Sequence, residues 1–192
     1  MPSMTAQDVL QALSDTGALL QGHFELRSGL HSAEFFQCAN LLRHPRVAQK
    51  LCAALADCVP EVLRSEIRTV VSPALGGILV GHEVARALDK LSIFAEKDAG
   101  KLVMRRFAIQ PGEPVLVAED VVTRGGRVQE TINLVRQAGG SVVAVVTLVD
   151  RSGGAATFDV PHFSLLQMSP VTWTASECPL CREGSHPVHP GS

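Results

Sequence analysis

The sequence predicts an α/β fold, with a mainly parallel sheet flanked by helices in a single domain spanning residues 1–192. Short apolar runs without polar alternation, such as Val115–Ala118 and Val142–Val149, are separated by segments with helical periodicity. Strands of this kind are buried on both faces, which is typical of parallel sheets covered by helices. Hydrophobic residues make up 46% of the 192-residue chain, so it can form a sizeable core.

The N-terminal segment is expected to begin with a helix and continue as extended chain. Thr5 followed by Asp8 is a capping pattern, which predicts a helix from Thr5 to about Ser14. A Ser28-Gly29 turn signal interrupts the extended stretch 24–38. Apolar residues at helical spacing then predict a helix over 45–59.

Strands and helices alternate through the rest of the domain. Strands are expected at 69–72, 92–95, 115–118, 142–149 and 163–166, and helices at 77–88 and 126–138. From about residue 169 to residue 192 the chain is rich in proline and shows little periodicity, so we expect an irregular C-terminal tail.

Composition and charge narrow the class of protein. With 17 basic and 19 acidic residues, the net charge is −2, and no global positive field favours nucleic acid or an anionic membrane. No apolar run is long enough to predict a membrane-spanning helix. Five cysteines, an odd number, are a poor disulfide framework, and Cys38, Cys52 and Cys58, which lie among apolar residues, are expected to be reduced. A cytoplasmic protein is the resulting prediction, with neither nucleic acid nor membrane as a partner.

The most informative segment joins a buried strand to a helix through two acids and a glycine-rich turn. Glu119 and Asp120 follow the apolar strand, and Gly125 and Gly126 precede the helix. Ligands of parallel α/β sheets bind at the carboxyl ends of the strands, which is where these residues are expected. Glycines and a helix N-terminus suit a phosphate, whereas carboxylates suit the hydroxyls of a neighbouring sugar. The segment therefore predicts a site for a ribose 5-phosphate group, although glycine-rich turns alone are weak evidence.

This segment resembles the phosphoribosyl diphosphate signature of the type I phosphoribosyltransferases. The resemblance implies that family's fold, with a small N-terminal hood formed by about residues 1–40. It also implies a set of residues that bind phosphoribosyl diphosphate: Glu119, Asp120, Val121, Val122, Thr123, Arg124, Gly125, Gly126 and Arg127. The 72–77 segment matches the family's diphosphate loop, but Leu75 and Gly76 stand where many members have an aromatic residue and a lysine. On its own evidence that loop could equally be an ordinary glycine turn.

Within the family, the chain is similar to members that act on orotate. The resemblance implies that Phe35 and Phe36 of the hood, Arg27, Thr123 and Arg151 contact this base. Arg27 stands where the family usually has a lysine. One of the two phenylalanines is expected to be a core residue, because successive strand side chains face opposite ways. The alternative role for Arg151 is an ion pair with Asp150 or another acid, although a guanidinium at a strand's carboxyl end suits a planar acid.

The same resemblance implies the activity, its cofactor and its oligomeric state. Ribose 5-phosphate would pass from phosphoribosyl diphosphate to orotate with Mg²⁺ as cofactor, in a homodimer whose catalytic loop is shared across the interface. Lys97 and Lys101 match the catalytic loop, and Asp120 is the third residue assigned to catalysis. The alternative for the loop is a solvated charged hairpin. An enzyme acting on another base and a non-catalytic regulator are rival functions; the hood and Arg151 argue against the first, and the absence of a basic helical pair argues against the second.

One cysteine pair has the spacing of a zinc site. Cys178 and Cys181 are separated by two residues and followed by His186 and His189. Because a second pair is missing and the tail is short, we assign no metal ligands from the sequence.

Overall fold

The computed structural model describes residues 4–26 and 28–190 and contains two sheets. The larger sheet has six strands in the order β5-β4-β3-β6-β7-β8, and every neighbouring pair is parallel except β4 and β5. The strands are β3 (Thr69–Pro73), β4 (Leu91–Asp98), β5 (Lys101–Val103), β6 (Pro114–Val122), β7 (Ser141–Asp150) and β8 (His162–Gln167). The predicted fold class is confirmed.

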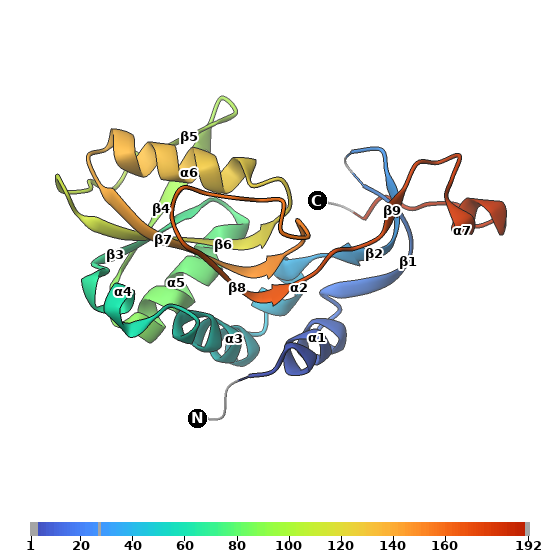
Figure 1. Cartoon of the computed structure of the whole chain (residues 1–192), viewed down its shortest axis with the longest axis horizontal. Coiled ribbons are helices and arrows are strands. Elements are labelled where there is room, and N and C mark those ends of the chain that lie inside the picture. Colours follow the sequence, from blue (N-terminus) through green and yellow to red (C-terminus); the bar gives the residue numbers. More distant parts are fainter. Residues whose placement is uncertain (1–3, 27, 191–192) are drawn as a thin grey trace.

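Helices cover both faces of this sheet (Figure 1). On one face lie α3 (Pro45–Asp57), α4 (Glu61–Glu66) and α5 (Gly76–Leu88), and on the other lies α6 (Gly126–Gln137). Successive side chains of β6 point to opposite faces of the sheet and so pack against helices on both sides. Val115 and Val117 belong to the hydrophobic cluster with α6, whereas Leu116 and Ala118 belong to the cluster with α3 and α5. A central strand buried on both faces is thus the reason for the apolar run in the sequence.

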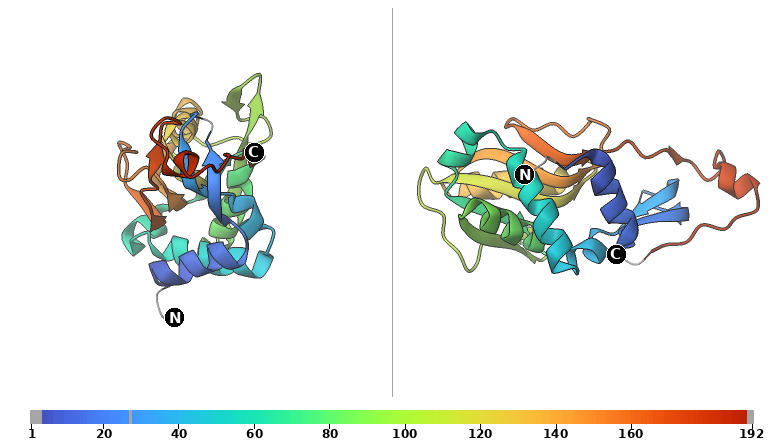
Figure 2. Two further views of the ribbon diagram at one scale, coloured as in Figure 1. Left: turned by 90° about the vertical axis from the view of Figure 1, so that its right-hand side faces the viewer. Right: turned by 90° about the horizontal axis from the view of Figure 1, so that it is seen from below.

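The hood is a separate three-stranded antiparallel sheet. It consists of β1 (Leu19–Glu25), β2 (His31–Phe36) and β9 (Thr172–Trp173), in the order β1-β2-β9. Figure 2 shows it extending from one end of the main body, together with the C-terminal segment. Before the hood, α1 (Ala6–Asp15) begins at Thr5 with the predicted capping box, since the Asp8 N–H donates to Thr5 Oγ1 at 3.2 Å and the Thr5 N–H to Asp8 Oδ2 at 2.9 Å.

Several elements differ from expectation. The short helices α2 (Cys38–Leu42) and α4 were not predicted, and β6 continues to Val122 instead of ending at Ala118. The tail is not wholly irregular, because it contains β9 and the short helix α7 (Pro179–Arg182). Among the described residues, no helix is long and apolar enough to cross a membrane.

Candidate functional site

The site is built around the end of β6, where two carboxylates lie side by side. Glu119 is 5% exposed and Asp120 is half-buried. The Asp120 N–H donates to Glu119 Oε1 at 3.1 Å, and the Val121 N–H donates to Asp120 Oδ1 at 2.9 Å. These backbone bonds fix both carboxylates at the carboxyl edge of the sheet, where the sequence predicted them.

Burial and mutual repulsion make this pair an unusual acid site. Burial, followed by the neighbouring charge of Asp120, holds the pKa of Glu119 well above its ordinary value of 4.5. Cys38 is buried close by, and burial together with the charge of Asp120 raises the pKa of its thiol. The Glu119–Asp120 pair would therefore be stabilised by hydroxyl donors or a cation brought against it.

The turn after β6 exposes backbone to the solvent. Thr123 and Arg124 are exposed, and Gly125 is the N-cap of α6 with φ of +77°, a conformation that favours glycine. A Cβ placed on Gly126, the first helical residue, would meet no atom within 4 Å. An exposed helix N-terminus with this much room is suited to a phosphate group.

Arg127 is directed elsewhere by its own helix. Its guanidinium pairs with Glu130 at 3.0 Å, and the other oxygen of Glu130 accepts the Leu102 N–H at 2.7 Å. This chain of contacts joins the first turn of α6 to the β4–β5 hairpin. Its remaining effect on the acid pair is electrostatic, because the charge of Arg127 slightly favours the ionised form of Glu119.

The 73–77 loop lies directly against the acid pair. A Cβ on Gly76 would lie 2.7 Å from Asp120 Oδ2, and one on Gly77 would lie 2.9 Å from Glu119 Oε1. Leu75, by contrast, is 85% exposed. The Asp120 carboxylate thus occupies the space that a side chain at position 76 would need, and glycine leaves this space open.

Arg151 follows β7 and connects the main sheet to the hood. Its guanidinium carbon lies 4.6 Å from the centre of the Phe36 ring, and its backbone N–H donates to the Val122 carbonyl at 2.8 Å. Asp150 instead accepts the Ser152 N–H at 2.8 Å, and no ion pair of Arg151 is present among the described residues. The buried Nε of Arg151 has no hydrogen-bond partner there either. Burial lowers the pKa of this guanidinium, because the charged group has lost part of its hydration. A bound anion would compensate for that loss.

The two phenylalanines have different environments. Phe36 is 6% exposed and belongs to the core, which confirms that one of the pair is a core residue, yet it also contacts Arg151. Phe35 is half-buried and its ring lies 5.7 Å from that of Phe24. Arg27 lies outside the described residues.

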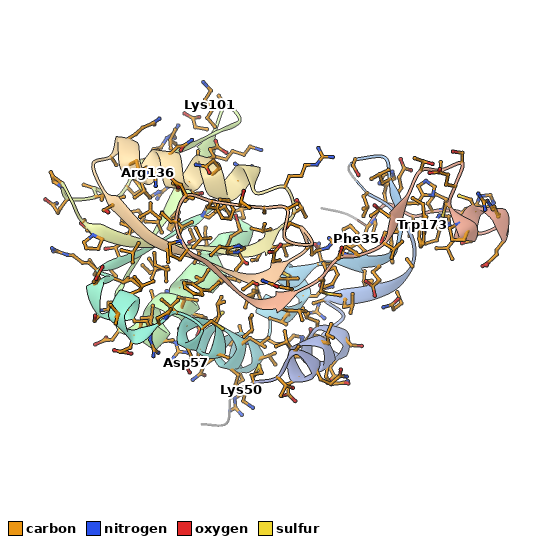
Figure 3. All side chains as sticks on the ribbon, viewed as in Figure 1. Phe35, Lys50, Asp57, Lys101, Arg136 and Trp173 are labelled. Carbon is orange, nitrogen blue, oxygen red and sulfur yellow. The ribbon has the colours of Figure 1, made fainter. Side chains whose placement is uncertain are left out.

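The lysines of the expected catalytic loop do not join this group. Lys97 pairs with Leu102 in the β4–β5 hairpin, and both Lys97 and Lys101 are exposed. Figure 3 shows Lys101 on that hairpin, far from Phe35 in the hood. The described chain therefore brings together the acid pair, the glycine turn and Arg151, whereas Lys97 and Lys101 are exposed on the β4–β5 hairpin.

Comparison with known proteins agrees with this geometry. Residues 37–174 match the family model described as the phosphoribosyl transferase domain. The orotate phosphoribosyltransferase of Acidithiobacillus ferrooxidans is 48% identical over 98% of both chains, and that of Desulforamulus reducens is also 48% identical over 98% of both. This chain belongs to the orotate phosphoribosyltransferase family.

Solved structures of phosphoribosyltransferases share its fold. The orotate phosphoribosyltransferase of Aeropyrum pernix superposes with a TM-score of 0.70 at 24% identity, covering 83% of this chain and 93% of that one. The adenine phosphoribosyltransferase of Rhodothermus marinus gives 0.62 at 26% identity, covering 83% and 99%. The two orotate phosphoribosyltransferases at 48% identity are much more similar in sequence than this adenine enzyme, which confirms the predicted family.

Proposed function

We propose that this chain transfers ribose 5-phosphate from phosphoribosyl diphosphate to orotate, giving orotidine 5′-phosphate and diphosphate in pyrimidine nucleotide synthesis. The observation that carries the proposal is the juxtaposition, at one sheet edge, of the Glu119–Asp120 pair, the glycine turn into α6 and the unpaired guanidinium of Arg151. The close relatives named orotate phosphoribosyltransferase support the same reaction.

Each part of the site has a role in this displacement at the ribose anomeric carbon. The turn from Thr123 to Arg127 holds the 5′-phosphate on backbone N–H groups, and the acid pair accepts the ribose hydroxyls. Arg151 presents its guanidinium to orotate, with Phe36 packed against it and Thr123 and Phe35 as further contacts. No side-chain nucleophile is needed, because a ring nitrogen of orotate attacks the anomeric carbon directly and diphosphate leaves. The protein supplies positioning and electrostatic stabilisation of the positive charge that develops on the ribose, to which Asp120 contributes.

The acid pair also fits the Mg²⁺ requirement that we propose. Mg²⁺ prefers oxygen ligands and keeps several waters, so Glu119 and Asp120 would hold a hydrated ion through the ribose hydroxyls. When bound, the ion would neutralise charge on the departing diphosphate.

The position of the lysines supports a homodimer as the active form. Because Lys97 and Lys101 are exposed residues of the β4–β5 hairpin, we propose that they reach the diphosphate in a partner's site. None of the five cysteines forms a disulfide, which fits the proposed cytoplasmic location.

Absorbance of orotate tests the function directly. Mixing the protein with orotate, phosphoribosyl diphosphate and Mg²⁺ should consume orotate, whereas adenine, hypoxanthine or uracil in place of orotate should give no product. Equal turnover of adenine would refute the proposed substrate.

Mixing of two variants tests the shared loop. Lys97→Ala and Arg151→Ala should each be nearly inactive alone, and a mixture that exchanges subunits should recover activity because one site of the mixed dimer is intact. A mixture as inactive as its components, despite exchange shown by native mass spectrometry, would argue against the shared loop.

A further inference from the structure

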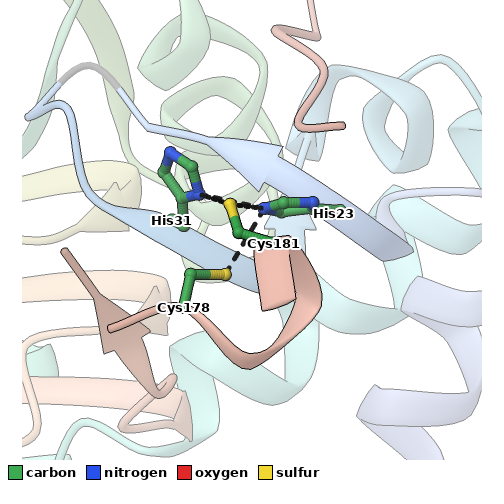
Figure 4. A group of neighbouring side chains, drawn as sticks. All are labelled: His23, His31, Cys178 and Cys181. Atoms are coloured by element: carbon green, nitrogen blue, oxygen red, sulfur yellow. Dashed lines mark hydrogen bonds between the residues drawn. The ribbon is translucent and has the colours of Figure 1, made fainter. Parts of the chain in front are cut away.

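Four potential metal ligands meet at the far end of the hood, away from the site above. They are His23 on β1, His31 on β2, and Cys178 and Cys181 at α7 (Figure 4), and their ligand atoms all lie within 4.8 Å of one another. The two cysteines are those with zinc-like spacing in the sequence, but the histidines are not the two that follow them. His186 is not in the cluster, and His189 pairs with Glu25 at 3.1 Å.

The distances within this cluster match a four-coordinate ion. His23 Nε2 and His31 Nδ1 are 2.9 Å apart, Cys178 Sγ is 3.4 Å from His23 Nε2, and Cys181 Sγ is 3.4 Å from His31 Nδ1 and 3.7 Å from His23 Nε2. In a tetrahedron with zinc's usual bond lengths, sulfur and nitrogen would be about 3.6 Å apart and two nitrogens about 3.3 Å. The four distances given lie within about 0.4 Å of these values, and all four ligand atoms lie within 4.8 Å of one another, so they surround a common point that a small adjustment would fit to zinc.

The surroundings of the cluster also favour a metal. His23, His31 and Cys178 are 6%, 5% and 0% exposed. Among the described residues after Leu166, Cys178 is the only buried one. This part of the tail has almost no apolar core of its own, so burial alone provides little to hold α7 against the hood.

Local structure orients the histidines. One extra residue of β1 lies between Gln21 and Phe24 in the pairing with β2, and this bulge includes His23. His23 Nδ1 lies 3.2 Å from Ser185 Oγ, so its N–H can donate to the hydroxyl and leave Nε2 free to bind a metal. A ligand histidine held in this way by a second hydrogen bond is characteristic of metal sites.

We propose that His23, His31, Cys178 and Cys181 bind one structural Zn²⁺ that fastens the C-terminal tail to the hood. Two cysteines and two histidines complete the tetrahedron, so no position is open for a substrate and the ion has no catalytic role. A simple disulfide between the cysteines would leave unexplained why two buried imidazoles point at the same place.

Metal content of protein purified without an affinity tag tests the proposal. Mass spectrometry of the metals should find about one zinc per chain, as a single closed site requires. Cys178→Ser and His31→Ala should each lose nearly all of it, while Cys58→Ser and His186→Ala, which change the same residue types outside the cluster, should retain it. Ser185→Ala should weaken zinc binding about tenfold, as expected for a group that orients a ligand.

Cobalt provides a readout that does not depend on variant stability. Replacing zinc in the full-length protein with Co²⁺ should give the intense visible bands of a tetrahedral ion and a thiolate charge-transfer band in the near ultraviolet. Wild-type protein that contains no zinc and gives no such bands would overturn the proposal, and so would a Cys178–Cys181 disulfide in freshly isolated protein.

Discussion

Gly126→Ala separates the phosphate-binding role of the α6 N-terminus from its structural role. The added methyl group would meet no atom of the described chain within 4 Å, so it should cause no clash in the free protein. Alanine is favoured over glycine within a helix by about 1 kcal/mol, and less at the first position, so the free energy of unfolding should be unchanged or rise slightly.

Binding of phosphoribosyl diphosphate should respond differently. If a phosphate sits on the N–H groups of this turn, the methyl group occupies its space and weakens at least one charge-assisted hydrogen bond, worth about 1.5–3 kcal/mol. That corresponds to a decrease of about 10- to 150-fold in kcat/KM for phosphoribosyl diphosphate. Urea unfolding and steady-state kinetics together measure both quantities, and Asn133→Ala, an exposed change on the same helix, serves as the control. Wild-type kinetics in a stable Gly126→Ala protein would refute a phosphate at this turn.

Three further predictions concern the residues around the acid pair. Gly77→Ala places a methyl group 2.9 Å from Glu119 Oε1. It should lower the free energy of unfolding by about 1–2 kcal/mol, which is the cost of overpacking minus the gain in helix propensity. Urea unfolding that matches wild type would show that the loop adjusts without cost. Burial raises the pKa of Glu119 in the folded protein, so its ionisation lowers the free energy of unfolding as pH rises from 4.5 through the folded pKa. Glu119→Gln should therefore unfold at a higher urea concentration than wild type, by a margin that grows with pH over this range. A margin that stays constant with pH would contradict this prediction. Arg151→Lys should raise the KM for orotate about 10- to 100-fold with little change for phosphoribosyl diphosphate, since lysine lacks the planar fork; equal effects on both substrates would indicate a structural defect.

Most of the main sheet could be predicted because its signals are local. The unbroken apolar run of β6 and the Gly125-Gly126 turn each reflect one element and its burial, and they located the acid pair correctly. The end of β6 was placed too early, because Glu119 and Asp120 have low strand propensity and the pairing with β7 extends the strand past them.

Contacts between distant segments could not be predicted in this way. Nothing near Gly76 in the sequence indicates that Asp120 fills the space beside it, since the two meet only when α5 packs next to β6. The same holds for His23 and His31, which lie far along the chain from Cys178, whereas His186 and His189 are near it in sequence but outside the cluster. Residues that meet only through tertiary structure leave no spacing pattern.

The hood's third strand has a consequence for biosynthesis. His31 on β2 pairs with Trp173 on β9, so segments far apart in the sequence complete a single sheet, and the backbone of His23 also accepts the Val188 N–H at 2.9 Å. During translation, β1 and β2 leave the ribosome long before β9, so one edge of β2 stays unpaired until residues 172–173 have been made. Termination of translation before residue 172 would consequently leave β2 without a partner on one edge, so a defect late in the sequence would destabilise the hood near its start.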